Sequence, residues 1–255
     1  MNNSYHDLIK YWFAEDIGDG DHTSLSCIPQ TAIGKSQLII KEKGVLAGVD
    51  VAREIFHAFD PELKMQVFIQ DGAQVNVGDI AFEVEGKVLS LLQTERLMLN
   101  IMQRMSGVAT VTRKYAQQLE GLKTKVLDTR KTTPGLRLLE KEAVKIGGGT
   151  NHRIGLYDMI LLKDNHVDFA GGIANAINRA KQYCIEKKKQ LKIEIEVRNF
   201  DELQQALSCG VDRIMLDNFT PENTRKAVQI IAGACETESS GGITFDTLRA
   251  YAECG

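Results

Sequence analysis

The sequence predicts an α/β protein whose second half is built from parallel βα units. From about residue 124, short β-rich runs alternate with amphipathic helical stretches, and this alternation is typical of parallel strands joined by helices. The 255 residues are 43% hydrophobic and 25% charged, as expected of a globular chain with a sizeable core. The rhythm before residue 105 is different, so a domain boundary is expected between residues 105 and 124.

The first part of the chain mixes helices and strands. Residues 5–15 have apolar side chains at helical spacing and are expected to form a short helix, and the acidic, glycine-containing stretch 16–24 is expected to be a surface loop. A helix is expected over residues 51–59. Strands are expected at 36–41, 64–69 and 80–84.

Residues 87–105 are densely apolar at helical spacing and predict a core helix, which Ser106 and Gly107 are expected to end before a further helix runs to about residue 119. Arg96 is unusual within this stretch. An arginine on so apolar a helix must extend to solvent, form an ion pair, or face another chain.

The second half contains five expected strands and five expected helices. Thr220 before Pro221 is a typical helix start, while Asn199 with Glu202 has capping-box spacing and Gly210 ends that helix. The strands are expected at 125–128, 159–162, 193–197, 213–216 and 234–237, and the helices at 136–146, 171–187, 201–209, 221–232 and 244–253.

Charge and cysteine content exclude several classes of protein. The formal net charge of −3 argues against a general nucleic-acid binder, and no apolar run is long enough to span a membrane. Residues 1–7 lack the basic-then-apolar layout of a signal peptide. The five scattered cysteines favour reduced thiols and a cytoplasmic location. Residues 121–166 carry nine basic and five acidic residues, which suits a compact anionic metabolite.

Polar residues follow each expected strand of the second half. In a parallel βα barrel the carboxyl ends of the strands meet at one mouth, where active sites lie. Since side chains alternate along a strand, only one of Glu194 and Glu196 is expected to face inward. The strand-end residues are Asp128 to Lys131, Lys163 to His166, Glu194 and Glu196, Asp217 and Asn218, and Glu238 to Gly242.

These residues form a cationic half and an anionic half. Arginine and lysine side chains bind carboxylates and phosphates. Glu196 and Asp217 facing such a site indicate Mg²⁺, although salt bridges to the basic residues would account for either carboxylate equally well. The cationic half comprises Arg130, Lys131, His152, Arg153 and Lys163.

Two glycine-containing segments complete the pattern. The Ser239–Gly242 segment precedes a helix expected near Phe245, and a helix N-terminus favours phosphate. The three glycines of residues 147–149 are expected to give flexible backbone just before His152 and Arg153.

Taken together, these segments resemble the quinolinate phosphoribosyltransferases. The matching segments are collinear and cover nearly the whole chain: EDIGDGDHTS (15–24), ERLMLN (95–100), SGVAT (106–110), DTRKTTPGLR (128–137), GGGTNHR (147–153), LKDNH (162–166), EIEV (194–197), LDNF (216–219) and ESSGG (238–242). The resemblance implies an N-terminal α/β sandwich domain over residues 1–105, followed by an incomplete parallel α/β barrel over residues 106–255. The family pattern continues beyond Gly255 into a further strand and glycine-containing loop.

The resemblance also implies a reaction. The family converts quinolinate and phosphoribosyl pyrophosphate, with Mg²⁺, into nicotinate mononucleotide, CO2 and pyrophosphate. It forms homodimers, or higher oligomers, in which one N-terminal domain covers the partner's barrel mouth, and Arg96 would reach the partner's site. The implied catalytic residues are Lys131, Lys163, Glu196 and Asp217, of which the two acids would hold Mg²⁺.

The implied substrate contacts divide by ligand. Arg130, His152, Arg153 and Lys163 would bind the quinolinate carboxylates or the adjacent substrate, next to Thr129. Lys131, Glu196 and Asp217 would serve phosphoribosyl pyrophosphate, and Ser240, Gly241 and Gly242 would hold its 5′-phosphate.

Three alternatives stay open. One is a related phosphoribosyltransferase that acts on nicotinate or a molybdenum-associated substrate. Another is a Schiff-base lyase of the aldolase type, in which Lys163 is the nucleophile. The third is a binding protein without catalytic activity.

Overall fold

The structure, a computed structural model, describes residues 5–255 apart from the His6 side chain. Residues 1–4, part of the segment considered for a signal peptide, lie outside the described residues. The chain divides into two compact units. In the part of the chain that the structure describes, the first unit comprises residues 5–116 and 126–151, and the second comprises residues 117–125 and 152–255. The domain boundary placed at residue 105 stays a prediction.

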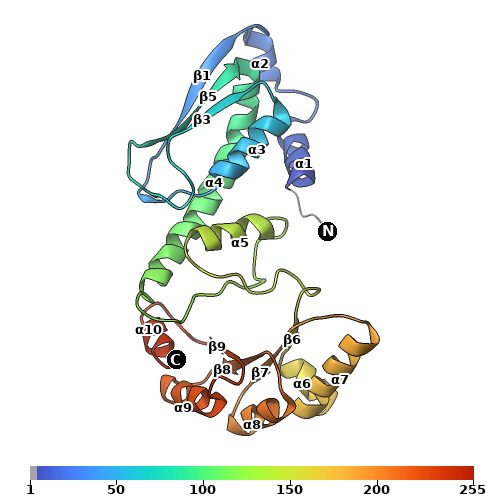
Figure 1. The fold of residues 1–255 in the computed structure, drawn as a ribbon. Coiled ribbons are helices and arrows are strands. Elements are labelled where there is room, and N and C mark those ends of the chain that lie inside the picture. The colour runs from blue at the N-terminus through green and yellow to red at the C-terminus, as the bar shows by residue number, and fades with distance from the viewer. Residues whose placement is uncertain (1–4) are drawn as a thin grey trace. The chain divides into compact units, whose positions relative to one another are not determined.

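The first unit is built on a three-stranded antiparallel sheet, in the order β1 (Ile33–Ile39), β5 (Ile80–Lys87), β3 (Lys64–Val67). A second, two-stranded sheet pairs β2 (Gly44–Val45) with β4 (Gln74–Val75). Figure 1 shows these elements with the helices of the unit. The helices are α1 (His6–Ile17), α2 (His22–Cys27), α3 (Val49–Phe59), α4 (Val88–Gln117) and α5 (Arg137–Ile146).

The core of the first unit lies between β5, α3 and α4. Phe56 of α3 meets Phe82 of β5 edge to face, with ring centroids 6.2 Å apart. Met102 and Met105 of α4 are almost fully buried in the same cluster. Flexible methionine side chains fill such irregular core space well. The predicted apolar face of residues 87–105 is therefore confirmed as core.

The predicted helix end at Ser106 and Gly107 is wrong, because α4 continues through both residues as one helix of 30 residues. The Ser106 hydroxyl accepts a hydrogen bond from Ala47 N at 3.0 Å and donates to Ala47 O at 3.2 Å. Its side chain thus bonds to a neighbouring segment and leaves the helix backbone intact. Tertiary contacts override the weak helix preference of serine and glycine here.

The loop predicted at residues 16–24 is also partly wrong, since helix α2 begins within it. The Asp21 side chain accepts a hydrogen bond from Ser24 N at 3.0 Å, which makes Asp21 the N-cap. An aspartate three residues before a free backbone N–H is a typical helix start. The acidic composition of the stretch concealed this local signal.

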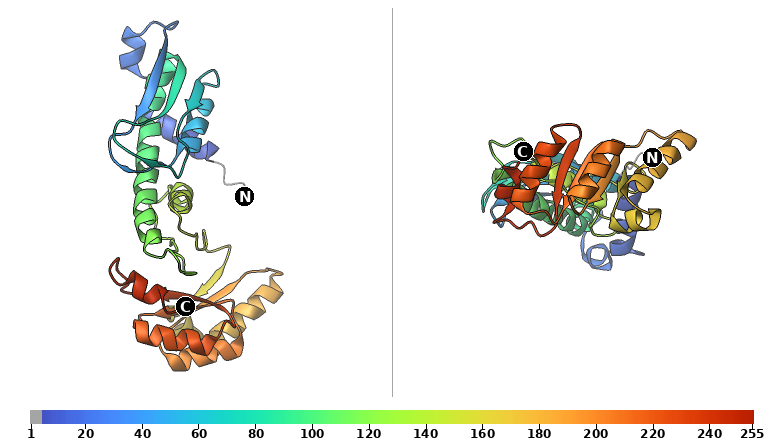
Figure 2. Two further views of the ribbon diagram at one scale, coloured as in Figure 1. Left: turned by 60° about the vertical axis from the view of Figure 1, so that its left-hand side comes forward. Right: turned by 90° about the horizontal axis from the view of Figure 1, so that it is seen from below.

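The second unit is a four-stranded parallel sheet in the order β6-β7-β8-β9. Helices α6 to α9 lie together on one side of it (Figures 1 and 2). Ile195, Val197, Ile214 and Leu216 face these helices and form the core with them. The strands are β6 (Ile160–Leu162), β7 (Ile193–Val197), β8 (Arg213–Asp217) and β9 (Glu236–Ser240), and the helices are α6 (Asp164–Ala170), α7 (Ile173–Glu186), α8 (Phe200–Cys209), α9 (Pro221–Ile231) and α10 (Leu248–Ala252).

The cap predictions in this unit are confirmed. The Thr220 hydroxyl accepts from Asn223 N at 3.2 Å with Pro221 at the first helical position, and Asn199 accepts from Glu202 N at 2.9 Å. Gly210 follows α8 with φ of 71°, the left-handed region that favours glycine.

Three element predictions need correction. The strand expected at 125–128 is a single parallel bridge between Leu127 and Thr150. Helix α6 was not predicted, and the expected helix at 244–253 is limited to the five residues of α10. Short elements carry too few residues for a periodic pattern to define them.

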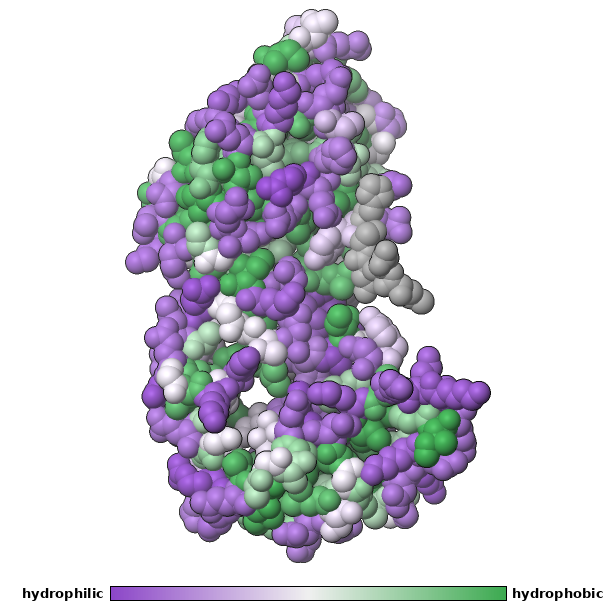
Figure 3. Space-filling model, in the orientation of Figure 1, coloured by the Kyte–Doolittle hydropathy of each residue, from purple (hydrophilic) through white to green (hydrophobic). Residues whose placement is uncertain are grey.

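The architecture confirms the predicted fold class. The first unit combines helices with antiparallel sheets, and the four described strands of the second unit make an open parallel sheet, as an incomplete α/β barrel requires. On the face drawn in Figure 3, hydrophilic residues are spread over both units. Among the described residues, no helix has the length and apolar character of a membrane span. All five cysteines are free thiols.

Candidate active site

Four predicted site residues stand at the carboxyl end of the parallel sheet. Lys163 directly follows β6, Glu196 is next to last in β7, and Asp217 and Ser240 end β8 and β9 as partners in register. The ammonium group of Lys163 lies 4.0 Å from Glu196 Oε2. The sheet thus gathers a lysine, two carboxylates and a hydroxyl at the edge where parallel α/β proteins bind ligands.

The electrostatics of Glu196 reflect a crowded anionic position. Burial raises the pKa of this carboxyl, and the neighbouring Asp217 charge raises it further, while Lys163 acts in the opposite direction. Two carboxylates that repel each other are stabilised by any cation bound between them. This pair therefore has the donor chemistry of a site for a hard, oxygen-preferring cation.

Gly241 allows β9 to leave the sheet close to Asn218. The Asn218 N–H donates to Ser240 O at 2.8 Å, and the Asn218 amide donates to Asp217 Oδ2 at 2.7 Å. A Cβ on Gly241 would clash with Asn218 Oδ1, and the φ of Gly241 is 89°. Hydrogen bonds and close packing therefore hold Asp217, Asn218 and Gly241 together. The expected helix start at Phe245 is absent, because α10 begins at Leu248.

Replacing Gly241 with alanine is expected to lower the free energy of unfolding by about 1–3 kcal/mol, because the new Cβ would clash with Asn218 in a left-handed conformation. Thermal unfolding of the variant measures this loss. Gly233→Ala is a suitable control, since Gly233 also has positive φ but has open space at its Cβ position. Equal losses in both variants would contradict a role for the close approach to Asn218.

Glu194 and Glu196 both lie on the face of β7 opposite the helices, so the prediction that only one faces inward is wrong. Residues two positions apart point to the same side of a strand, while the intervening Ile195 belongs to the helix-facing core. Glu194 is fully buried and lies 2.7 Å from Nε2 of His152. Nδ1 of His152 accepts from Arg153 N, also at 2.7 Å.

Arg213 and Glu238 complete this buried cluster. An Arg213 Nη1 atom lies 3.6 Å from Glu194 Oε2 and 3.3 Å from Glu238 Oε2, and Glu238 is 3.5 Å from His152 Nε2. Burial and the Glu194 charge raise the pKa of Glu238 to about 7, against the opposing effect of His152 and Arg213. Next to His152, this face of the sheet therefore carries two closely spaced carboxylates that share one guanidinium.

The remaining cationic candidates belong to the first unit. Thr129, Arg130 and Lys131 follow Asp128, and the Thr129 hydroxyl accepts from Lys131 N at 3.0 Å. The Nε atom of Arg130 is buried without a hydrogen-bond partner among the described residues. An unpartnered buried donor is costly, so this guanidinium is suited to receive an anion.

A buried ion pair fixes the start of this segment. Lys141 Nζ lies 2.5 Å from Asp128 Oδ1, and both side chains are less than a tenth exposed. With its side-chain amide in the orientation that satisfies its neighbours, Asn151 donates from nitrogen to Asp128 Oδ2 and to Lys141 O, both at 2.8 Å. Glu140, adjacent to Lys141 on α5, accepts from Thr133 N at 3.2 Å. Helix α5 thus holds residues 128–133 at both ends.

The glycines at residues 147–149 serve close packing, in contrast to the predicted flexibility. A Cβ on Gly147 would lie 2.6 Å from Ala109 O, and one on Gly149 would lie 2.7 Å from Val144 Cγ1. The Arg113 side chain donates to Gly147 O at 3.0 Å. The end of α5 is therefore pressed against α4, which fixes the chain that leads to Thr150 and Asn151.

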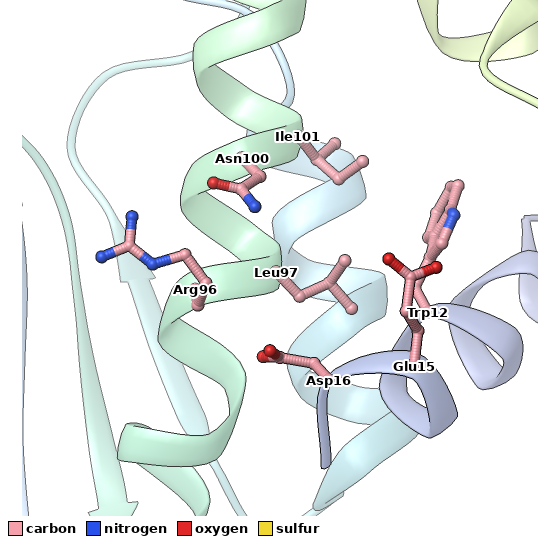
Figure 4. A pocket seen from close by; sticks show the side chains of 7 residues that line it. All are labelled: Trp12, Glu15, Asp16, Arg96, Leu97, Asn100 and Ile101. Carbon is pink, nitrogen blue, oxygen red and sulfur yellow. The ribbon is translucent and has the colours of Figure 1, made fainter. Parts of the chain in front are cut away.

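Arg96 is exposed on α4 and makes no ion pair among the described residues. It contributes to the lining of a cavity of about 200 Å³ between α1 and α4. Figure 4 shows its guanidinium directed away from the carboxylates of Glu15 and Asp16 on α1. The expectation that Arg96 extends beyond its own apolar helix is consistent with this exposure.

Of the polar residues in these clusters, Lys141 and Arg213 were missed from the sequence, whereas Glu194 and Glu238 were named only as strand-end residues. Glu194 shares the spacing of Glu196, and a correct strand periodicity would have placed both on one face. Lys141 is two residues from each of the buried Leu139 and Ala143, which places it on a different side of helix α5, so spacing alone did not indicate its buried partner. Arg213 and Glu238 carry no local signal either, because only strand pairing brings them to Glu194.

Comparison with known proteins identifies the family. Two domain models match nearly the whole chain: quinolinate phosphoribosyl transferase, N-terminal domain, over residues 21–106, and its C-terminal domain over residues 108–255. A probable nicotinate-nucleotide pyrophosphorylase [carboxylating] of Bacillus subtilis is 39% identical over 97% of this chain and 84% of its own length. Quinolinate phosphoribosyltransferase [decarboxylating] 1b of Nicotiana tabacum is 40% identical over 97% of this chain and 75% of its own.

Solved structures agree with the sequence matches. NadC from Streptococcus pyogenes superimposes with a TM-score of 0.91 at 39% identity, covering 97% of this chain and 86% of that one. The nicotinate-nucleotide pyrophosphorylase from Francisella tularensis gives 0.89 at 40% identity, covering 100% and 90%. From the two domain models and these relatives, the chain belongs to the quinolinate phosphoribosyltransferase family.

Proposed function

We propose that this chain transfers the phosphoribosyl group of phosphoribosyl pyrophosphate to quinolinate, with decarboxylation, giving nicotinate mononucleotide, CO2 and pyrophosphate. This is a pentosyl transfer of NAD biosynthesis. Family membership supports the reaction, and one structural observation carries it. Lys163, Glu196 and Asp217 stand together at the carboxyl end of one parallel sheet, with Lys163 Nζ 4.0 Å from Glu196.

The cationic residues would bind and orient the substrates. Both substrates are anions that repel each other, so their approach needs compensating positive charge. Arg130, His152, Arg153 and Lys163 would contact the quinolinate carboxylates, and the buried, unpartnered Nε of Arg130 fits that role. Thr129 would support this segment.

The other candidates would serve phosphoribosyl pyrophosphate. Lys131 is exposed and makes no ion pair among the described residues, so its ammonium group is available to the pyrophosphate. Ser240, Gly241 and Gly242 would hold the 5′-phosphate with a hydroxyl and backbone N–H groups.

Glu196 and Asp217 would hold Mg²⁺, whose oxygen preference matches two neighbouring carboxylates, and the Asp217 charge raises the pKa of Glu196. The ion would supply positive charge to the departing pyrophosphate. Lys131 and Lys163 would add fixed positive charge on the protein side, so catalysis would depend on positioning and electrostatics without a protein nucleophile.

The proposed reaction has two steps, phosphoribosyl transfer and then decarboxylation. The bond from ribose C1 to pyrophosphate oxygen breaks, the pyridine nitrogen attacks the cation-like C1, and a pyridinium forms. The bond from C2 to its carboxylate then breaks, its electron pair stays on the ring that the pyridinium polarises, and C2 takes up a proton as CO2 leaves. The pyridinium supplies the electron sink, and the protein holds both carboxylates in place.

We further infer a cytoplasmic homodimer or higher oligomer in which Arg96 reaches the partner's site. The exposed position of Arg96 and its direction away from Glu15 and Asp16 support this (Figure 4). Mixing Arg96→Ala protein with a variant inactivated at Asp217 tests it. Recovered activity in the mixed dimer is expected if the two residues serve the same site from different subunits.

The decisive assay is quinolinate-dependent release of CO2 with and without phosphoribosyl pyrophosphate. Release only with both substrates is expected. Turnover of nicotinate without CO2 would favour a related phosphoribosyltransferase, and an adduct trapped on Lys163 by borohydride would favour the Schiff-base lyase. Tight quinolinate binding without turnover would indicate a binding protein.

Asp217→Asn is expected to raise the Mg²⁺ concentration needed for half-maximal activity by about ten-fold or more, because one charged oxygen ligand becomes a neutral amide. A Mg²⁺ titration of the initial rate measures this. Asp212→Asn is not a suitable control, because its carboxylate accepts from Ile193 N at 2.7 Å. Asp246→Asn, on the exposed segment before α10, is the matched control. If Asp217→Asn needed the same Mg²⁺ concentration for half-maximal activity as the wild-type protein, the metal role would be contradicted.

A further inference from the structure

A buried carboxylate lies beneath His152 and is not among the residues with proposed substrate contacts. Glu194 is 0% exposed, and its Oε2 atom lies 2.7 Å from His152 Nε2. A fully buried carboxylate loses several kcal/mol of hydration and needs compensation from its neighbours. Here the compensation comes from the His152 ring and from the Arg213 guanidinium at 3.6 Å.

The contacts of His152 specify which ring nitrogen carries the proton. Nδ1 accepts a hydrogen bond from Arg153 N at 2.7 Å, so Nδ1 is the unprotonated nitrogen. Nε2 faces the Glu194 carboxylate, so Nε2 carries the hydrogen and donates it. A neutral imidazole with these two partners has one tautomer only.

The same contacts connect Glu194 to Arg153. Glu194 fixes the His152 ring, and the ring accepts the Arg153 backbone N–H. The Arg153 guanidinium in turn donates to Met159 O at 3.1 Å. The Glu194 carboxylate therefore fixes the orientation of the His152 ring. The ring in turn holds the backbone of Arg153, a proposed quinolinate-binding residue.

Arg213 faces the same Glu194 oxygen, Oε2, that meets His152, while Glu194 Oε1 is buried without a hydrogen-bond partner among the described residues. Arg213 Nη1 lies between the two carboxylates, 3.6 Å from Glu194 and 3.3 Å from Glu238. His152, Glu194 and Glu238 have ligand atoms within 4.8 Å of one another, a spacing that could also suit a metal ion. The guanidinium already supplies the positive charge that such an ion would bring.

We propose that Glu194 is a positioning residue, which fixes His152 in its Nε2–H tautomer and thereby places Arg153 for the quinolinate carboxylates. Glu194 itself need not touch substrate. The kinetic part of this inference rests on the proposed function, whereas the tautomer of His152 can be measured without any turnover.

The first measurement is the ¹⁵N NMR signature of the His152 ring at neutral pH, assigned by its loss in His152→Gln. Wild-type protein is expected to show protonated Nε2 and unprotonated Nδ1. Glu194→Ala is expected to show a mixture of tautomers, and Glu194→Gln is expected to keep the wild-type signature because its amide oxygen still accepts the bond. A wild-type ring protonated at Nδ1 would overturn the proposal.

The second measurement is the kinetics of the same variants. Glu194→Ala is expected to raise the KM for quinolinate about ten-fold or more, with the KM for phosphoribosyl pyrophosphate changed less than about three-fold, because one hydrogen bond to a charged group is lost. Glu194→Gln is expected to restore most of the quinolinate affinity. An unchanged quinolinate KM in Glu194→Ala would overturn the proposal.

The matched control is Glu236→Gln, which removes an equal charge from the same arginine at a half-exposed position. Arg213 Nη2 lies 2.7 Å from Glu236 Oε2, and the Glu236 side chain is 52% exposed. Both readouts are expected to stay at wild-type values in this variant.

Should Glu194→Ala not fold, Glu194→Met fills the volume without accepting a hydrogen bond and carries the same expectation. If CO2 release fails in every protein while the tautomers behave as expected, the proposed function fails and the positioning contact stands.

Discussion

Replacing Lys141 with methionine is expected to lower the free energy of unfolding by about 3–5 kcal/mol, because it leaves the Asp128 carboxylate buried without its ionic partner. Lys141 and Asp128 are 3% and 7% exposed, with Nζ and Oδ1 2.5 Å apart. Methionine preserves most of the side-chain volume, so the loss reports on charge. Urea unfolding at one fixed protein concentration measures it, since an oligomer's stability depends on concentration.

Lys145→Met is the control for this experiment. Lys145 belongs to the same helix α5 and pairs with Glu142 at 3.0 Å, but both side chains are about half exposed. A surface pair of this kind contributes at most about 1 kcal/mol. The double variant Lys141→Met/Asp128→Leu should lose less stability than Lys141→Met alone, because no buried charge is left. Equal losses for Lys141→Met and Lys145→Met would contradict the role of burial.

Arg130→Ala is expected to weaken quinolinate binding by about 2–4 kcal/mol, since it truncates one partner of a desolvated charge pair. This corresponds to about a 30- to 800-fold increase in Kd. The buried Nε of Arg130, which lacks a partner among the described residues, is the structural reason. Isothermal titration calorimetry with quinolinate alone measures the effect without requiring catalysis.

Two further variants make this test specific. Arg130→Lys keeps the charge but loses the paired geometry of the guanidinium, so an intermediate affinity is expected. Arg53→Ala removes an exposed arginine of α3 that pairs with Asp50, and its affinity should match wild type. Wild-type affinity in Arg130→Ala would remove Arg130 from the quinolinate site.

The sequence predicted regular elements well where a strong periodic pattern coincided with a chemical stop signal. Strand β7 has the predicted bounds Ile193–Val197, and the caps at Asn199 and Thr220 hold their helices as expected. The wrong predictions fall where a contact between residues far apart in the sequence determines the local structure. Ser106 continues α4 because its hydroxyl bonds to Ala47, 59 residues away in the chain.

The candidate site was predictable as a set of residue types but not as a set of contacts. Strand ends gave Lys163, Glu196 and Asp217, since parallel strands bring their carboxyl ends to one edge. The pairing of Lys141 with Asp128 depends on how α5 packs, which no spacing rule reveals. The same holds for His152 with Glu194, which are 42 residues apart in the chain.

The tight approach of Gly147 and Gly149 to α4 has a consequence for how this protein tolerates change. Any larger residue there would push away the helix whose Glu140 and Lys141 hold the segment with Arg130. In a screen of random substitutions, changes at these glycines should therefore abolish activity as often as changes at residues that contact substrate. The set of inactivating positions would then include residues that support the structure of the site as well as residues that contact the substrates.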